Sequence, residues 1–186
     1  MTRKGLEWQR PSVVEQATGV VLEIGFGSGL NLPFYKNVDR LYALDPSQEL
    51  YELAQKRIGW AAFPITQLRA SAEAIPLVDN SVNAVVSTWS LCSIPHPHLA
   101  LREILRVLKP NGKFVFIEHG KSPKNLVARI QRFLTPVWKS VAGNCHLDRE
   151  MDQLISQTNL QIQKMEKFQQ RLSPLIFMYK GTAVKK

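Results

Sequence analysis

With 186 residues, of which 45% are hydrophobic and 21% charged, the chain has the length and composition of one globular domain. No apolar stretch reaches the roughly 20 residues that cross a bilayer, and residues 1–19 lack the apolar segment of a signal peptide. The two cysteines, Cys92 and Cys145, have no metal-ligand spacing. The sequence therefore predicts neither a zinc site nor a disulfide framework. It predicts a cytoplasmic location.

The formal net charge of +9 is concentrated in the last third of the chain. Residues 1–120 contain 12 Lys and Arg against 11 Asp and Glu, whereas residues 121–186 contain 12 against 4. Such a basic segment suits an anionic membrane surface, a nucleic acid or an acidic partner, and it equally suits an ordinary solvated face.

Residues 1–19 are expected to form a short flap anchored by Trp8 and Pro11. The apolar run that follows, Val20 to Ile24, predicts a buried strand. Three glycines at alternate positions follow, and Leu30-Asn31-Leu32 is expected to form the first turn of a helix. Glycines let a ligand lie against the main chain, and a helix start offers free N–H groups. This pattern predicts a site for a nucleotide-like ligand, with simple packing of a helix on a sheet as the alternative.

Two acids lie where a purely structural strand would not need them. Glu23 falls in the last turn of the first strand, where an apolar residue is expected. Asp45 ends the next apolar run, Leu41 to Asp45, about 20 residues after the glycines, where an acid can accept hydrogen bonds from two ribose hydroxyls. Pro46-Ser47 then begins a helix that extends to about Ile58.

The remaining pattern alternates strands and helices. We expect strands at 65–70, 82–88 and 113–118, a loop at 71–77, helices at 97–108, 123–140 and 148–157, and a final antiparallel hairpin of 160–168 and 176–184. The turn Lys109-Pro110-Asn111-Gly112 should stop the helix before it. Alternation of this kind predicts an α/β fold, a doubly wound, mostly parallel sheet that binds its ligand at the carboxyl ends of the strands.

Two of these helices carry apolar stripes that should face the core. In residues 47–58 the stripe consists of Leu50, Leu53, Ala54 and Ile58. In residues 123–140 it consists of Leu126, Ile130, Phe133, Leu134 and Val137, and the polar side is basic: Lys124, Arg129, Arg132 and Lys139. The second helix, with Trp138 beside its cations, also suits contact with a membrane surface.

The residues resemble a known family. Glu23-Ile24-Gly25-Phe26-Gly27-Ser28-Gly29 is similar to the first motif of class I S-adenosylmethionine-dependent methyltransferases, and Asp45 to their ribose-binding acid. Ser71 to Pro76 resembles their adenine-side loop, and Leu101 to Gly112 their helix followed by an L-K-P-G-G turn. The resemblance covers residues 20–183 and implies a Rossmann-like, seven-stranded sheet with a C-terminal antiparallel hairpin.

Within that superfamily the chain is most similar to small alkyl thiol S-methyltransferases of animals and their bacterial relatives, and next to bacterial phospholipid N-methyltransferases. The matching stretches are Leu91 to Ile94, Glu118-His119, and Gly143 to Glu150. The resemblance implies one domain, residues 1–186, in which residues 20–120 bind the cofactor and the basic residues 121–186 lie on the substrate side. The implied acceptor is a small or lipidic thiol or amine.

The resemblance also implies which residues hold S-adenosylmethionine: Glu23, Gly25, Phe26, Gly27, Gly29, Asp45, Pro46, Ser71, Ala72, Glu73 and Trp89. His119 and His146 are the candidate bases for an acceptor that must lose a proton. The chain departs from the family in its short N-terminal flap, in having no apolar N-terminal membrane anchor, and in Ser71, where many members carry an acid.

Three other functions are weighed against this one. A nicotinamide-binding protein would carry G-x-G-x-x-G, but position 30 is Leu. A nucleic-acid methyltransferase would suit the charge, but no N/D-P-P-Y/F-type motif follows the fourth strand. A non-catalytic module could keep the fold and use the basic last third to hold an acidic partner.

Overall fold

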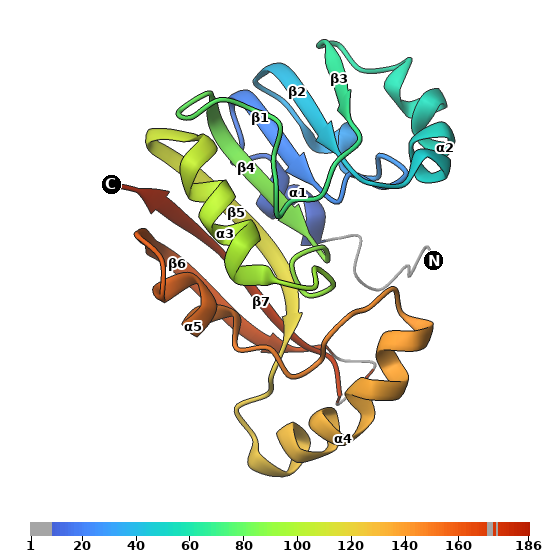
Figure 1. Ribbon diagram of the computed structural model, residues 1–186, viewed down its shortest axis with the longest axis vertical. Helices are drawn as coiled ribbons and strands as arrows, with labels where there is room; N and C mark the ends of the chain where they lie inside the picture. Colours follow the sequence, from blue (N-terminus) through green and yellow to red (C-terminus); the bar gives the residue numbers. More distant parts are fainter. Residues whose placement is uncertain (1–8, 171–172, 174) are drawn as a thin grey trace.

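The computed structural model describes residues 9–170, 173 and 175–186, so the expected anchor Trp8 lies outside the described residues. The described chain forms a seven-stranded sheet in the order β3-β2-β1-β4-β5-β7-β6 (Figure 1). Strands β1 to β5 pair in parallel, and β7 pairs antiparallel with both β5 and β6. This confirms the predicted Rossmann-like sheet with its C-terminal hairpin. The strands are β1 (Gly19–Ile24), β2 (Val38–Leu44), β3 (Ile65–Leu68), β4 (Val82–Thr88), β5 (Leu108–Gly120), β6 (Leu160–Gln169) and β7 (Phe177–Lys185).

Helices cover both faces of the sheet (Figure 1). On one face α3 (Pro97–Val107) and α5 (Met151–Ser156) pack in a hydrophobic cluster with the sheet. On the other face α1 (Arg10–Val14), the 3-10 helix η2 (Leu32–Phe34) and α2 (Gln48–Ile58) contribute to a second cluster. The central β4 is buried along almost its whole length, as its unbroken apolar run predicts for a parallel sheet.

The first crossover differs from the prediction. The glycine turn is followed by the three residues of η2 rather than by the start of an α-helix. Proline at position 33 fixes one backbone angle, and β2 begins only four residues after Phe34, so the chain has no length for a longer helix. Residues 109–112 also differ from the prediction. Helix α3 ends before them, at Val107, as expected, but these residues belong to the long strand β5 instead of forming a separate turn.

Helix α2 begins as predicted, with the Ser47 hydroxyl accepting a hydrogen bond from the backbone N–H of Leu50 at 3.2 Å. Its apolar stripe faces the core only in part, because Ala54 and Ile58 pack in the second hydrophobic cluster and the two leucines do not. Among the residues of the helix only Ala54 is buried, whereas Leu53 is 66% exposed and Leu50 is 40% exposed. The helix lies at the outer edge of the sheet, beside β3, where little chain is available to cover it (Figure 1).

Helix α4 (Asn125–Val141) departs furthest from the prediction. Its buried residues are polar, Gln131 and Thr135, and the predicted core stripe is exposed except at the half-buried Leu134. The Gln131 amide explains this orientation: it accepts a hydrogen bond from Ser122 N and donates to the carbonyl oxygens of Gly120 and Leu175. The helix is therefore held by backbone contacts through one buried amide, and its apolar side faces outward.

In the described part of the chain, none of the helices combines the length and the apolar character that crossing a bilayer requires.

Candidate active site

A cavity of about 410 Å³ opens at the carboxyl ends of the parallel strands. Its lining residues come mainly from the glycine turn after β1, the end of β2, the loop after β3 and the segment after β4, and one comes from the loop after α4. They are Gly25, Gly27, Leu44, Asp45, Pro46, Leu50, Ala70, Ser71, Ala72, Trp89, Ser90, Ser93, Ile94, Pro95 and Gly143. Seven of the eleven residues predicted to bind the cofactor are in this set. The structure thus brings the centre of the predicted site together in one cleft.

The glycine turn forms the floor of the cleft. Gly25 has φ +65° and Gly27 has φ +55°, a left-handed conformation that side chains disfavour. A Cβ atom on Gly25 would overlap the side chain of Ser90, so the turn and the segment after β4 approach each other closely. A Cβ on Gly27 would meet nothing nearer than 3.9 Å and would project into the ligand space. Backbone, rather than side chain, is what this turn offers to a ligand.

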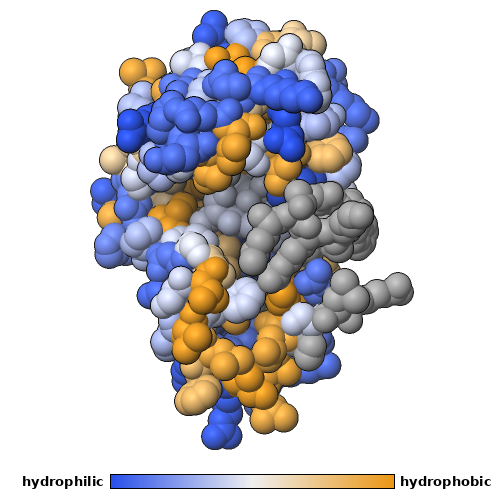
Figure 2. All heavy atoms as spheres, turned by 90° about the vertical axis from the view of Figure 1, so that its right-hand side faces the viewer, coloured by the Kyte–Doolittle hydropathy of each residue, from blue (hydrophilic) through white to orange (hydrophobic). Residues whose placement is uncertain are grey.

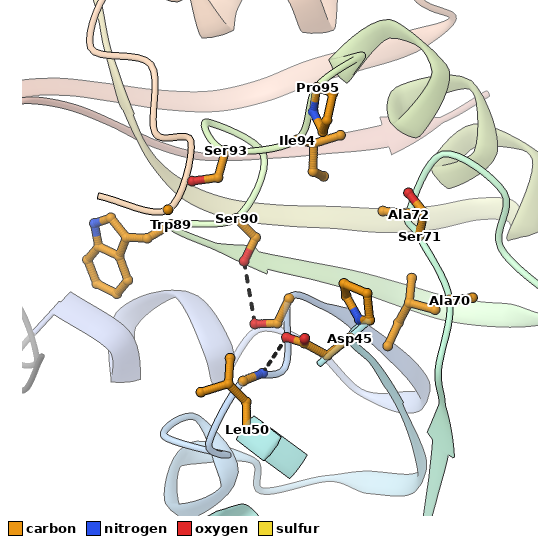
Figure 3. Close-up of a pocket in the computed structure, with 15 residues that line it drawn as sticks. Asp45, Leu50, Ala70, Ser71, Ala72, Trp89, Ser90, Ser93, Ile94 and Pro95 are labelled. Carbon is orange, nitrogen blue, oxygen red and sulfur yellow. Dashed lines mark hydrogen bonds between the residues drawn. The ribbon is translucent and has the colours of Figure 1, made fainter. Parts of the chain in front are cut away.

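Asp45 is fixed at the end of β2 by two backbone donors. Its Oδ2 accepts a hydrogen bond from Gly27 N at 2.8 Å (Figure 3). Its Oδ1 accepts one from Ser47 N at 2.9 Å. Each carboxylate oxygen retains acceptor capacity, because it can accept more than one hydrogen bond. The carboxylate is therefore positioned in advance for two further donors from a ligand in the cleft.

Trp89 forms part of the opposite wall in a strained conformation. Its φ of +54° is rare for a bulky residue, and such strain is concentrated at functional sites. The Arg10 guanidinium lies 4.6 Å from the centre of its ring. Among the described residues, no hydrogen-bond partner satisfies the buried indole nitrogen.

Four predicted cofactor residues do not line the cavity. Phe26 and Gly29 lie beneath the turn, where Phe26 packs in the core near Tyr51. Glu73 accepts hydrogen bonds from Ser71 and from the backbone N–H of His96. Glu23 is buried below the turn.

Glu23 holds the turn from underneath. Its carboxylate accepts hydrogen bonds from Asn31 Nδ2 at 2.9 Å and from the Tyr35 hydroxyl at 2.7 Å, and Asn31 accepts in turn from Arg10. Burial raises the pKa of Glu23 to about 7, although both hydrogen bonds oppose the shift. Glu23 thus braces the segment after the glycines from below.

A pH dependence of stability follows from Glu23. Because its pKa in the folded chain, about 7, lies above the ordinary value of 4.5, its contribution to stability is complete below pH 4.5 and is lost as the pH rises through 7. The loss is about 3 kcal/mol in the free energy of unfolding. We expect Glu23→Gln to flatten the unfolding free energy between pH 4.5 and 7 in urea titrations. An unchanged pH profile in the variant would contradict the assignment.

The two candidate bases do not line the cavity either. His119, at the end of β5, is buried with its Nδ1 directed at the Cys145 sulfur, 3.2 Å away. His146 is half-buried, 3.8 Å from Asp148, and burial lowers its pKa, so its imidazole is neutral near physiological pH.

The residues that the sequence reasoning missed form the far wall of the cleft. Ser90, Ser93, Ile94 and Pro95 follow β4 and face Asp45 across the cavity (Figure 3). Ser93 and Ile94 belong to the stretch that resembles the thiol S-methyltransferases, but that resemblance assigns them no role. A chain segment directly after a central parallel strand is a general signal for binding.

Glu118 organises that wall. This fully buried carboxylate accepts hydrogen bonds from the Ser87 hydroxyl and from three successive backbone N–H groups, those of Ser90, Leu91 and Cys92. Burial raises its pKa, and the four hydrogen bonds lower it. The segment after β4 therefore wraps around a buried acid.

Comparison with known proteins agrees with the geometry. Residues 22–116 match the family model described as a methyltransferase domain. The chain is 34% identical over 137 residues to thiol S-methyltransferase TMT1B of Rattus norvegicus, covering 70% of this chain and 55% of that protein. It is 28% identical over 118 residues to phosphatidylethanolamine N-methyltransferase of Cereibacter sphaeroides, covering 62% of this chain and 58% of that protein. The chain thus spans little more than half the length of these relatives.

The fold is shared with solved structures. The crystal structure of YcgJ from Bacillus subtilis superposes with a TM-score of 0.72 at 17% identity, covering 98% of each chain.

Proposed function

The chain belongs to the class I S-adenosylmethionine-dependent methyltransferases, and from this premise we propose that it transfers a methyl group to a small or lipidic acceptor, with a thiol as the acceptor class. The observation that carries the proposal is the cleft in which the Asp45 carboxylate, held by two backbone N–H groups, faces the strained segment after β4.

The cleft residues fit S-adenosylmethionine. We assign the Asp45 carboxylate to the two ribose hydroxyls and the backbone at Gly25 and Gly27 to the amino-acid part, since a side chain at Gly27 would occupy the same space. Ser71 and Ala72 are assigned to the adenine side. The sulfonium of the cofactor supplies the activated methyl group, and the protein contributes mainly positioning.

The acceptor must reach the methyl group as a nucleophile. A thiol reacts as its thiolate, so its proton must leave before the new carbon–sulfur bond forms and the electron pair of the broken bond returns to the cofactor sulfur. His146 is the base that we propose for this proton, because it lies three residues after Gly143, which lines the cleft, and its side chain is half-buried there. The likeness to thiol S-methyltransferase TMT1B supports the thiol over other acceptors.

The test is a methyl-transfer assay with isotopically labelled S-adenosylmethionine and a panel of alkyl thiols, analysed by mass spectrometry. We expect a labelled methyl sulfide with the wild type and none with Asp45→Ala. Binding of S-adenosylhomocysteine without turnover on any thiol or amine would overturn the proposal and support a non-catalytic module.

A phospholipid amine is the second candidate acceptor, and helix α4 favours it. The exposed residues Leu126, Ile130, Phe133, Val137 and Val141 recur every three or four positions and so form one apolar face. Arg129 and Arg132 are exposed beside them. Figure 2 shows hydrophobic residues gathered at the end of the molecule where α4 lies in Figure 1. We propose that this face contacts an anionic lipid surface from the cytoplasmic side.

Co-sedimentation with vesicles of anionic and neutral lipid tests this contact. We expect preferential binding to anionic vesicles at low salt. Phe133→Asp should weaken this binding by about tenfold, because the membrane would no longer bury the aromatic side chain. Leu53→Asp is the matched control, since Leu53 is similarly exposed on α2. Equal weakening by both variants, or no preference for anionic vesicles, would remove the proposal.

A further inference from the structure

We propose that Cys92, His119 and Cys145 form a zinc site beside the cleft. The three residues come from the segment after β4, the end of β5 and the loop after α4, and all three are buried. Their ligand atoms lie close together: the two sulfurs are 3.5 Å apart, and His119 Nδ1 lies 3.2 Å from the Cys145 sulfur and 4.0 Å from that of Cys92. The sequence spacing does not reveal the set, because each residue lies on a different segment.

The triangle has the size that a tetrahedral ion requires. Zinc bonds of about 2.3 Å to sulfur and about 2.0–2.1 Å to imidazole place two sulfurs about 3.8 Å apart and a sulfur and a nitrogen about 3.5 Å apart. Each of the three measured separations lies within roughly half an ångström of these values. An ion can therefore be accommodated with small side-chain adjustments.

The ligand-bearing segments are held in place without an ion. The backbone N–H of Cys92 donates to the Glu118 carboxylate, and the backbone carbonyl of Cys92 accepts a hydrogen bond from His146 N. Asn144 Nδ2 donates to the carbonyl of Ser93 at 2.8 Å, which joins the two cysteine-bearing loops a second time. Such outer contacts orient ligands in known metal sites.

The surroundings of His119 agree with cation binding. Its Nδ1 faces both sulfurs, 3.2 Å from that of Cys145 and 4.0 Å from that of Cys92. His119 is about nine-tenths buried, yet its Nε2 has no hydrogen-bond partner in the part of the chain that the structure describes. The imidazole is thus oriented by the sulfurs alone.

Three protein ligands leave the fourth position of a tetrahedron open, as in catalytic zinc sites. The cluster itself lies beside the cleft, because Ser93, next to Cys92, and Gly143, two residues before Cys145, both line it. An acceptor thiol bound at the open position would give up its proton, which the proposed function assigns to His146, and would coordinate as the thiolate, the nucleophilic form. This last step rests on the proposed function, whereas the metal site does not.

Metal analysis of the purified full-length protein tests the site. We expect close to one equivalent of zinc per chain, and cobalt added to chelator-treated protein should give sulfur-to-cobalt charge-transfer absorption. Cys92→Ser, Cys145→Ser and His119→Gln should each weaken zinc binding by at least about tenfold. The control His146→Gln should retain it, since His146 lies next to Cys145 in sequence but outside the cluster.

Measurements on the wild-type protein are sufficient to overturn the proposal. Protein without zinc and without the cobalt absorption, or a Cys92–Cys145 disulfide that persists under reducing conditions, would do so even where the variants fail to fold. Loss of zinc from His146→Gln equal to the loss from His119→Gln would overturn the ligand assignment. If an acceptor thiol coordinates the ion, an alkyl thiol should change the spectrum of the cobalt-loaded protein in the absence of S-adenosylmethionine. An unchanged spectrum would exclude thiol coordination. Absence of turnover in zinc-loaded protein would remove the proposed function and leave the site standing.

Discussion

Replacing Asp45 with alanine is expected to weaken S-adenosylhomocysteine binding by about a hundredfold or more. Hydrogen bonds to a charged group contribute about 1.5–3 kcal/mol each, and this carboxylate has acceptor capacity for two ribose hydroxyls. The backbone donors Gly27 N and Ser47 N already hold it in place, so a ligand need not order it on binding. Calorimetric titration of the wild type and the variant with S-adenosylhomocysteine measures the effect.

The control lies on the same strand. Asp39 is exposed at the start of β2, far along the strand from the cleft, so Asp39→Ala should bind the ligand as the wild type does. Because Asp45→Ala also leaves two backbone N–H groups without their acceptor, its thermal unfolding must be measured beside the titration. A folded Asp45→Ala variant with wild-type affinity would show that the ribose is bound elsewhere.

The parts of the site that the sequence predicts are those encoded locally. The glycine turn and Asp45 each follow an apolar strand, and parallel strands bring their carboxyl ends to one edge of the sheet. Gly25, Gly27 and Asp45 therefore meet in the cleft as expected. The mostly parallel sheet followed from the same alternation of strands and helices, and the structure confirms it together with the C-terminal antiparallel hairpin.

The parts that could not be predicted depend on contacts between distant segments. Helical periodicity locates an apolar face but does not say what covers it, and α4 is fixed through the polar Gln131 instead. The exposure of Leu50 has a similar origin, since this residue lines the cleft rather than the core. His119 and Cys145 are 26 residues apart, so only the folded chain brings them together.

Glu118 connects these features, because it holds the wall of the cleft and one of the cysteines at the same time. Glu118→Ala should lower the free energy of unfolding by about 3–5 kcal/mol, the cost of removing one partner from a buried charged interaction. Three backbone N–H groups, those of Ser90, Leu91 and Cys92, would remain buried without their acceptor. Urea unfolding of the variant measures this loss.

Glu166→Ala provides the comparison, since Glu166 on β6 accepts hydrogen bonds from two lysines and its side chain is 44% exposed. Exposed ion pairs contribute about 0–1 kcal/mol, so this variant should unfold almost as the wild type does. If the Glu118 variant folds, its loosened wall should also weaken S-adenosylhomocysteine binding, because Ser90 approaches the glycine turn at Gly25. Equal stability of the two variants would mean that the segment after β4 keeps its shape without the buried acid, and the cleft would then depend on the glycine turn alone.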